Sequence, residues 1–298
     1  MKKIRPNIIK RISYSFVTKY LFKSILSTES IKSNNNSQTE IHSLVCHGDL
    51  YIYLYAIKSF IKNTTSCSVV IHSDGSLSNE DEYLLKKHIE GVKIYSIKEA
   101  DEIVMSKLKK YPLLRELRRK NPLLKKLTDF HFLSESEKII SLDSDILFFK
   151  KSEEITNWIR SNEKSALLSD ETPVNSHQDK YLCKTNLNYV KNLNSGLICY
   201  YKDMIDLGLA EKCFKLKGFM TLYRPNGIGD QQFMAVNFGE ARETKNIKVN
   251  RLDPNKYIHN REIKNESAIA KHYWSAKHSL RKLLIYIKDI NGVHMSIK

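Results

Sequence analysis

The chain has 298 residues, 41% of them hydrophobic, and carries 49 lysines and arginines against 33 acidic residues, for a formal charge of +16. That length and apolar content allow a sizeable buried core, which excludes a disordered chain, while the charge favours anionic partners such as nucleic acid, anionic lipid or nucleotide diphosphates. Five scattered cysteines without a Cys-x-x-Cys pair argue against a disulfide framework or zinc knuckle and favour a reducing cytosol.

Residues 1–27 form a basic segment that contains no acidic residue. Its seven cations alternate with apolar residues at near-helical spacing, which predicts a basic amphipathic helix. That helix either lies on an anionic membrane surface, packs on the domain or belongs to a targeting segment. No stretch approaches the roughly eighteen consecutive apolar residues that cross a bilayer, so membrane attachment here is peripheral. We interpret the polar run Ser33–Gln38 as a linker, which gives an arm and linker at 1–40 and one domain at 41–298.

From residue 41, apolar strands alternate with helices. The expected elements are, in order, a strand at Ile41–Cys46, a helix at Leu50–Ile61, a strand at Val69–His72, a helix from Ser78, a strand at Val92–Ile97 and a helix at Glu99–Met105. This order predicts an α/β fold with a mainly parallel central sheet flanked by helices. His47, in the turn after the first strand, either contacts a base or ribose or is a structural histidine.

The segment Lys107–Lys126 is dense in basic residues and interleaved with leucines. It is either a solvated basic helix face beside the core or a cationic wall that faces phosphates or lipid headgroups. Lys126 is singled out, because a helix packed under the following strand would bring its ammonium group to a diphosphate.

The stretch Glu137–Lys150 carries two carboxylates, Asp143 and Asp145, between two apolar runs. The apolar residues predict a buried strand, and ligands of open α/β sheets gather at the carboxyl ends of such strands. An Asp-x-Asp there is either a turn that closes a strand or a hard-oxygen site for Mg²⁺ or Mn²⁺ with substrate phosphates.

Polar groups also flank later apolar segments. Asp170 follows the predicted strand Ser165–Ser169. Asn194-Ser195-Gly196 begins another strand, where the glycine either permits close approach of a ligand or marks a bulge.

Asp230-Gln231 opens the apolar helix Phe233–Val236, so Asp230 is an N-cap, a site carboxylate or both. Late in the chain, His272-Tyr273 precedes Lys277 and His278, and a basic amphipathic segment follows at Leu280–Ile290.

In their order as well as their content, these segments resemble the GT-A glycosyltransferases, most closely the family-8-like nucleotide-diphospho-sugar transferases of bacteria. The resemblance spans roughly residues 41–277. Its motifs are the first strand Ile41–His47, Lys126, Asp143-Ser144-Asp145, Asn194-Ser195-Gly196, Asp230-Gln231 and His272-Tyr273 with Lys277. It implies a Rossmann-like GT-A fold, here with a basic helical arm added at the N-terminus.

The resemblance also implies a metal site. Asp143 would contact ribose and metal, Asp145 would be a direct ligand and His272 the third. Two carboxylates and one imidazole suit Mn²⁺ somewhat better than Mg²⁺. Lys277 would hold the departing diphosphate, and Lys126 would stand where the family often has an arginine, without the bidentate fork of that side chain.

The implied donor site lies beside the metal. Asn194, Asp230 and Gln231 would line the donor sugar, and Asp170 would accept a sugar hydroxyl; these four are the expected catalytic residues. The expected donor-binding set is His47, Lys126, Asp143, Ser144, Asn194, Ser195, Gly196 and Lys277.

The late motif departs from the family pattern. Ser275 replaces a glycine, the lysine comes one place early, and His278 follows in place of a proline-tryptophan pair. The metal ligand is therefore His272 or His278, with His272 preferred. Retention of anomeric configuration is a family expectation that no spacing in this chain tests.

The sequence thus predicts a metal-dependent glycosyltransferase with a nucleotide-diphosphate sugar donor, UDP-linked by preference, and a glycan or lipid-linked acceptor in surface polysaccharide synthesis. Its expected location is the cytoplasm, at the inner face of the cell membrane. The alternatives are a basic nucleic-acid-binding protein, although no recognition module is present, and a catalytically inactive GT-A scaffold. A nucleotidyltransferase is disfavoured, because no glycine-rich phosphate loop follows the first strand.

Overall fold

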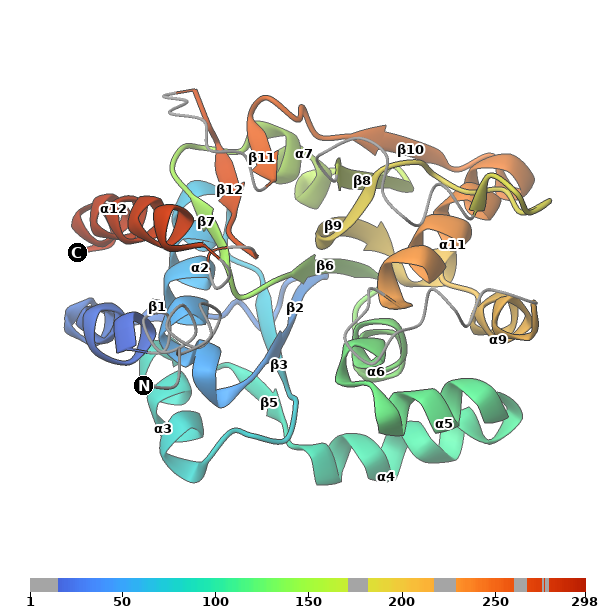
Figure 1. Cartoon of the computed structure of the whole chain (residues 1–298), viewed down its shortest axis with the longest axis horizontal. Coiled ribbons are helices and arrows are strands. Elements are labelled where there is room, and N and C mark those ends of the chain that lie inside the picture. The colour runs from blue at the N-terminus through green and yellow to red at the C-terminus, as the bar shows by residue number, and fades with distance from the viewer. Residues whose placement is uncertain (1–15, 171–181, 217–228, 260–266, 275, 277–278) are drawn as a thin grey trace, which may run out of the picture.

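A seven-stranded sheet runs through the middle of the molecule in the order β10-β8-β9-β6-β2-β3-β5 (Figure 1). The computed structural model describes residues 16–170, 182–216, 229–259, 267–274, 276 and 279–298. The strands are β2 Thr39–Val45, β3 Ser68–Ser73, β5 Lys93–Tyr95, β6 Lys138–Leu142, β8 Ser165–Asp170, β9 Leu193–Tyr201 and β10 Lys248–Arg251. All neighbours pair in parallel except β9, which is antiparallel to both β6 and β8. The predicted mainly parallel α/β sheet is confirmed.

Two smaller sheets complete the strand pairing. One joins β11 (Tyr257–His259), β12 (Ala270–His272) and β7 (Ile146–Phe148), with β12 antiparallel to β7. The other pairs β1 (Ile31–Lys32) in parallel with β4 (Ile89–Glu90). Because β7 follows β6 after a short turn, the three-stranded sheet is attached directly to the carboxyl edge of the central one.

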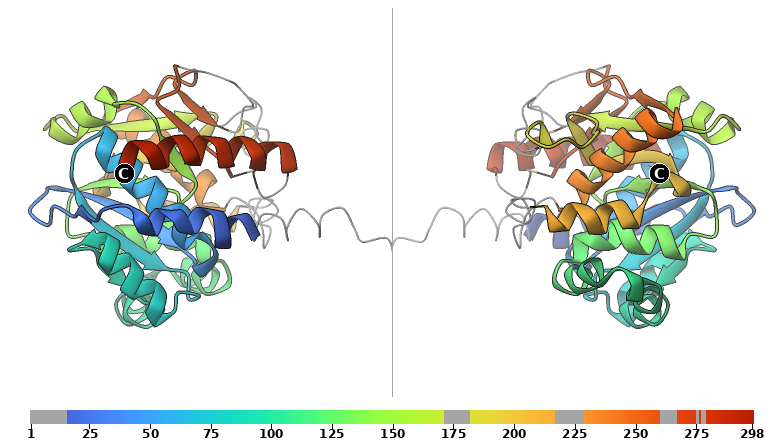
Figure 2. Two further views of the ribbon diagram at one scale, coloured as in Figure 1. Left: turned by 90° about the vertical axis from the view of Figure 1, so that its left-hand side faces the viewer. Right: turned by 90° about the vertical axis from the view of Figure 1, so that its right-hand side faces the viewer.

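Helices cover both faces of the central sheet (Figures 1 and 2). On one side lie α2 (Leu50–Asn63), α3 (Asn79–His88) and α12 (Leu280–Ile297). On the other side lie α4 (Ile97–Lys107), α5 (Pro112–Lys120), α6 (Lys125–Leu133), α9 (Leu207–Lys215) and α11 (Gly229–Lys245). The short helix α7 (Glu153–Arg160) lies near β8. Two hydrophobic clusters follow this division, one under α2 and α12 and the other under α4 to α6, α9 and α11. The sheet therefore separates two cores.

Local sequence explains where helices begin. Ser78 and Ser96 each cap a helix, and their backbone N–H groups in turn donate hydrogen bonds to the carboxylates of Asp81 and Glu99. The second capping box starts α4 at residue 97, so the strand predicted at Val92–Ile97 is reduced to Lys93–Tyr95.

The described part of the N-terminal segment packs on the domain, which is one of the three alternatives given for it above. The short helical turns η1 (Val17–Leu21) and η2 (Phe22–Ser27) bury Phe22 and Ile25 in the main core. The predicted linker is also packed, since Ser33 N donates to Glu90 O at 2.8 Å and Val69 N donates to Ser33 Oγ at 3.0 Å. Ser33, at the start of the polar run, is thus held by a backbone hydrogen bond to β4 and by a side-chain hydrogen bond to β3, which composition does not reveal. Residues 1–15 lie outside the described residues.

The basic segment Lys107–Lys126 is only partly a solvated face. Arg118 is buried and donates to both carboxylate oxygens of Asp129, at 2.6 and 2.8 Å. Lys125 and Lys126 are buried as well. At least three of these cations are therefore part of the protein interior and do not face solvent. Among the described residues, no helix has the length and apolar character needed to cross a bilayer.

Candidate active site

The Asp-Ser-Asp turn connects two buried strands. Every residue of β6 and of β7 is buried, and Asp143 N donates to Gly196 O on β9 at 2.8 Å. The apolar residues on both sides thus fix the turn at the carboxyl edge of the sheet, while the side chains of Asp143 and Asp145 remain 28% and 21% exposed. Both carboxylates can therefore reach a ligand.

His272 joins these carboxylates through strand pairing. It lies on β12, opposite Ile146 of β7 in the antiparallel register. His272 Nε2 is 3.0 Å from Asp145 Oδ1 and 3.8 Å from Asp143 Oδ2. One ligand atom from each of these three residues lies within 4.8 Å of the others, which is a compact set of two carboxylates and an imidazole.

Asn194 orients the imidazole. Its Oδ1 accepts hydrogen bonds from Gly196 N at 3.0 Å and from His272 Nδ1 at 3.2 Å. An amide oxygen only accepts, so His272 carries a proton on Nδ1 and directs Nε2 toward the two aspartates. This is the tautomer that a metal ligand needs, and the donor set fits a divalent cation such as Mn²⁺.

Gly196 makes room for the cluster. A Cβ atom at this position would lie 2.6 Å from His272 Cε1, 2.9 Å from Asn194 Oδ1 and 3.0 Å from Asp143 Oδ2. The pairing of β8 with β9 also shifts register between Leu168 and Ser169. Gly196 therefore lies in an irregular part of the strand and also allows close approach of neighbouring groups, which are the two roles considered for it from the sequence.

Lys126 lies behind the aspartates. Its Nζ is 2.6 Å from Asp143 Oδ1, 3.6 Å from Asp230 Oδ2 and 3.3 Å from Ser195 O. Burial alone would lower the pKa of Lys126, but Asp143 and Asp230 raise it above its usual value. The side chain thus stays charged inside the protein.

The first turn of α11 supplies the next two residues. Asp230 and Gln231 are both buried, and Gln231 Oε1 accepts from Ser195 N at 3.2 Å. Asp230 Oδ2 has no hydrogen-bond partner among the described residues. A buried carboxylate oxygen in that state has a free site for a hydroxyl donor. Asp230 thus lies in the first turn of α11 beside Lys126, and its role as a site carboxylate stays a prediction.

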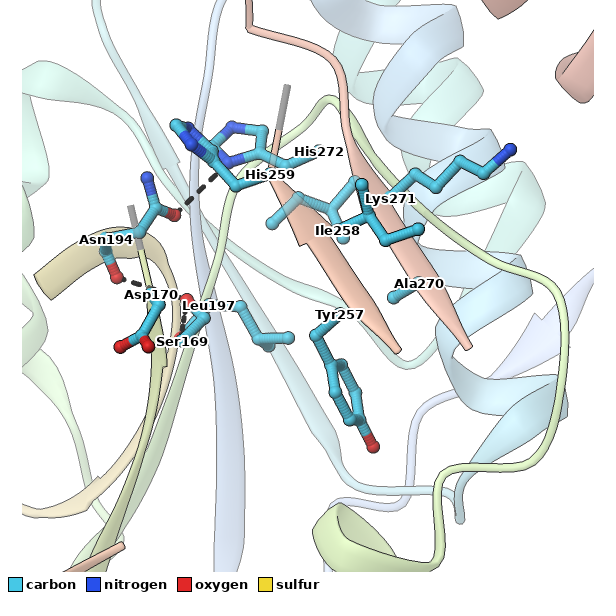
Figure 3. Close-up of a pocket in the computed structure, with 11 residues that line it drawn as sticks. Ser169, Asp170, Asn194, Leu197, Tyr257, Ile258, His259, Ala270, Lys271 and His272 are labelled. Atoms are coloured by element: carbon cyan, nitrogen blue, oxygen red, sulfur yellow. Dashed lines mark hydrogen bonds between the residues drawn. The ribbon is translucent and has the colours of Figure 1, made fainter. Parts of the chain in front are cut away.

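A shallow pocket is lined in part by His272 and Asn194 (Figure 3). Asp170, His259, Asn194 and His272 line its polar part, and Figure 3 shows Lys271 pointing away from it. The lining is completed by Ile146, Ser169, Leu197, Tyr257, Ile258 and Ala270. Asp170 also pairs with Arg251; burial raises the pKa of the carboxyl, and the guanidinium opposes that rise.

The structure brings most of the predicted site residues together, but not all of them. Asp143, Asp145 and His272 meet, and Lys126, Asn194, Ser195, Gly196, Asp230 and Gln231 surround them. His47 lies on the surface, where its Nδ1 is 2.8 Å from Asp81 Oδ2. Lys277 and His278 lie outside the described residues.

Two residues near the site were missed by the sequence reasoning. Asp49 accepts from Ser144 Oγ at 3.2 Å, so it, and not His47, contacts the Asp-Ser-Asp turn. His259 pairs with His272 in the register of β11 and β12, and the two rings lie 5.0 Å apart. A histidine at the end of the apolar Tyr257–His259 triplet was the available signal.

Comparisons with known proteins support the fold. No protein-family model and no curated protein matches the sequence. Among solved structures, the chain is similar to galactosyltransferase LgtC in complex with donor and acceptor sugar analogs (11% identity, TM-score 0.54, covering 86% of this chain and 95% of LgtC). It is also similar to mouse xyloside xylosyltransferase 1 in its apo form (12%, 0.51, 81% and 97%).

A third similar structure is the bifunctional glycosyltransferase WbbM (12% identity, TM-score 0.51), of which this chain covers 82% of its own length and 47% of WbbM. The protein has the fold of the GT-A glycosyltransferases, so the resemblance drawn from the motifs is confirmed at the level of the fold.

Proposed function

We propose that the protein is a metal-dependent glycosyltransferase that moves a sugar from a nucleotide-diphosphate donor to a glycan or glycolipid acceptor in surface polysaccharide synthesis. The observation that carries the proposal is the meeting of Asp143, Asp145 and His272 beside the buried Lys126, at the carboxyl edge of a GT-A sheet. Ligands of open α/β sheets bind at this edge.

Asp143, Asp145 and His272 would hold the divalent cation, with Mn²⁺ preferred over Mg²⁺ for this donor set. When bound, the cation would neutralise negative charge on the departing diphosphate. The fit is supported by the proton that Asn194 fixes on His272 Nδ1, because Nε2 is then available toward the carboxylates.

Lys126 and Asp230, whose Nζ and Oδ2 atoms lie 3.6 Å apart, would act on neighbouring parts of the proposed donor, its diphosphate and its sugar. The Lys126 ammonium is a fixed positive charge in a buried position, where it stabilises developing negative charge more than it would in water. Asp230 Oδ2 accepts a hydroxyl of the donor sugar, or stabilises oxocarbenium character at the anomeric carbon. Gln231 fixes the backbone of Ser195 between them.

The acceptor is proposed to enter from the side of the pocket that contains Asp170 and His259. This pocket shares Asn194 and His272 with the metal cluster, so an acceptor hydroxyl bound there lies beside the donor. Asp170 would accept a hydrogen bond from it. A UDP-sugar donor and retention of anomeric configuration complete the proposal, and both depend on the resemblance alone.

The test is release of nucleotide from a panel of nucleotide sugars by the purified chain with Mn²⁺, followed by chromatography. We expect Asp145→Asn to lose at least two orders of magnitude of turnover, since it removes a charged ligand. Asp203→Asn is the matched control, because that carboxylate lies on the surface and pairs with Lys164. Intact turnover in Asp145→Asn contradicts the metal site, and binding of nucleotide without any turnover favours an inactive scaffold.

A further inference from the structure

The outer face of α12 combines cations with exposed apolar side chains. Its inner face packs into the core through Leu283, Tyr286, Ile290 and Val293. On the opposite face lie, in order, Arg281, Leu284, Lys288, Met295 and Lys298. Leu284 is 67% and Met295 74% exposed, more than any other large hydrophobic side chain in the described part of the chain.

This face has no acidic side chain of its own. The one acid of α12, Asp289, turns inward and binds Lys271 Nζ at 3.0 Å and the hydroxyl of Tyr273. The charge presented outward by the helix is therefore positive only.

The N-terminal turns lie beside α12 and extend the same surface. Phe22 packs edge to face on Tyr286 at 5.3 Å, and Tyr55 of α2 bridges the two segments through Ser24 Oγ at 2.9 Å and His294 Nδ1 at 3.1 Å. Figure 2 (left) shows both segments side by side on one side of the molecule, in agreement with Figure 1.

The outward side chains of these turns have the same character as those of α12. Phe16, Tyr20 and Leu21 are 59%, 58% and 50% exposed, and Lys23 is exposed next to them. We call the combined surface the two-helix face; it consists of Phe16, Tyr20, Leu21, Lys23, Arg281, Leu284, Lys288, Met295 and Lys298.

We propose that the two-helix face docks on an anionic lipid surface. Five large apolar side chains interspersed with four cations match the boundary between acyl chains and anionic headgroups, where apolar groups insert and cations pair with phosphates. Nucleic acid would use the cations and leave the apolar side chains in water. In a cell, the inner face of the cell membrane is the surface that fits this chemistry.

This surface differs from the peripheral arm predicted from the sequence. Two apolar residues of that arm, Phe22 and Ile25, are buried in the core, and the C-terminal helix adds Leu284 and Met295 to the side chains that the arm leaves exposed. Docking therefore involves the folded domain itself.

The face is also connected to the candidate active site. Tyr273, next to His272, stacks on Tyr286 of α12 at 4.1 Å, and its hydroxyl binds Asp289 of the same helix. The lipid surface would thus hold the metal cluster at a fixed position above it. If the proposed function is correct, this favours an acceptor that is carried on a lipid.

The test is flotation of the full chain with vesicles of phosphatidylcholine, with and without phosphatidylglycerol, at low and high salt. We expect binding to the anionic vesicles only, weakened by salt. Each cation near an anionic leaflet contributes about fivefold in affinity, so Arg281→Gln with Lys288→Gln should weaken binding about 25-fold. Leu284→Gln with Met295→Gln should weaken it at least about tenfold, through lost apolar insertion.

The matched control is Lys98→Gln with Ile103→Gln on α4, a cation and an apolar side chain that are exposed on another part of the molecule. This variant should bind as the unchanged chain does, and all variants should keep the same thermal midpoint because the altered side chains are exposed.

Unchanged binding of both α12 variants would overturn the proposal and assign attachment to another segment, residues 1–15 included. Equal binding to neutral and anionic vesicles would contradict the proposed requirement for anionic lipid. A dimer in sedimentation that the α12 variants dissociate would instead assign the face to a second copy of the chain. None of these measurements uses metal or donor, so they test membrane docking independently of the proposed enzymatic function.

Discussion

Gly196 determines the geometry of the candidate metal site by having no side chain. The imidazole of His272, the amide of Asn194 and the carboxylate of Asp143 all approach the space that a Cβ atom would take. A β-strand normally disfavours glycine, because it has no side chain to pack and loses more backbone entropy on folding. Here that cost is offset by the close approach of three site residues.

Gly196→Ala should therefore damage the metal site more than the fold. Contacts of 2.6 to 3.0 Å force His272 or Asp143 to move, so we expect Mn²⁺ affinity, measured by electron paramagnetic resonance, to fall at least about tenfold. Gly292→Ala in α12 is the control, since its Cβ meets nothing within 4 Å, and it should stabilise the fold by about 0.5 kcal/mol. Equal Mn²⁺ affinity in Gly196→Ala and the unchanged chain would contradict this account.

Lys126 gives the candidate site a single buried ammonium group. Its Nζ contacts Asp143 Oδ1, while Asp143 Oδ2 faces His272. The lysine thus fixes the carboxylate, but it also places a positive charge close to where a cation would bind. At such distances in a partly buried site, charge repulsion outweighs the loss of one orienting contact.

Lys126→Gln is expected to bind Mn²⁺ at least about tenfold more tightly than the unchanged chain when no nucleotide is present. It should bind a nucleoside diphosphate more weakly, because the charge that meets the phosphates is gone. Isothermal titration with each ligand measures both. Lys125→Gln, which alters the neighbouring buried lysine that donates to Ser73 O, should change neither affinity. Weaker Mn²⁺ binding in Lys126→Gln would show that orientation matters more than charge.

At the scale of elements, the N-terminal turns are part of the core. Phe22 is almost fully buried between Tyr286 of α12 and Tyr55 of α2. These turns pack against the C-terminal helix, whose Tyr286 stacks on Tyr273, the residue that directly follows β12. The first described residues of the chain are therefore linked to the strand that carries His272.

Phe22→Ala should destabilise the protein by about 3 to 5 kcal/mol, the usual range for removal of a buried aromatic side chain. Tyr20→Ala, in the same segment but 58% exposed, should change the free energy of unfolding by less than about 0.5 kcal/mol. Urea unfolding measures both. Similar small effects of the two substitutions would mean that the segment is not packed in solution as it is here.

At the scale of the whole molecule, burial and the excess of cations together lower the pKa of two histidines, the buried His88 and the half-buried His131. The pKa of His88 and that of His131 are each lowered to about 4, first by burial and then by neighbouring lysines. Lys58 and Lys87 face His88, and Lys202, Lys107 and Lys110 face His131. Their ordinary pKa in an unfolded chain is near 6.5.

Acidification should therefore destabilise the fold. Below pH 6.5 the unfolded chain binds protons that the folded chain excludes until about pH 4, so stability is lost as the pH falls through this window. We expect the free energy of unfolding to drop by about 2 kcal/mol between pH 7 and pH 5 from these two residues. The double variant His88→Gln, His131→Gln should show a flatter dependence in denaturant titrations, and an equally steep one would assign the effect to other groups.

The sequence by itself determined the α/β class, the mainly parallel sheet and the position of the Asp-Ser-Asp turn, because strand periodicity, helix caps and apolar flanks are local. The order of short motifs added His272, Asn194 and Asp230 as candidates through resemblance. No spacing along the chain indicated that His259 or Asp49 would lie near them.

Only the tertiary structure decided which side chains meet. The antiparallel pairing of β12 with β7 brings His272 to Asp145, and the packing of α6 under the sheet brings Lys126 to Asp143. Hydrogen bonds between Ser33 and strands β3 and β4 hold the start of a polar run that composition predicted as a linker. The physical reason is the same in each case: strand pairing and helix packing join segments far apart in the chain, and their free energy depends on contacts that the local sequence does not contain.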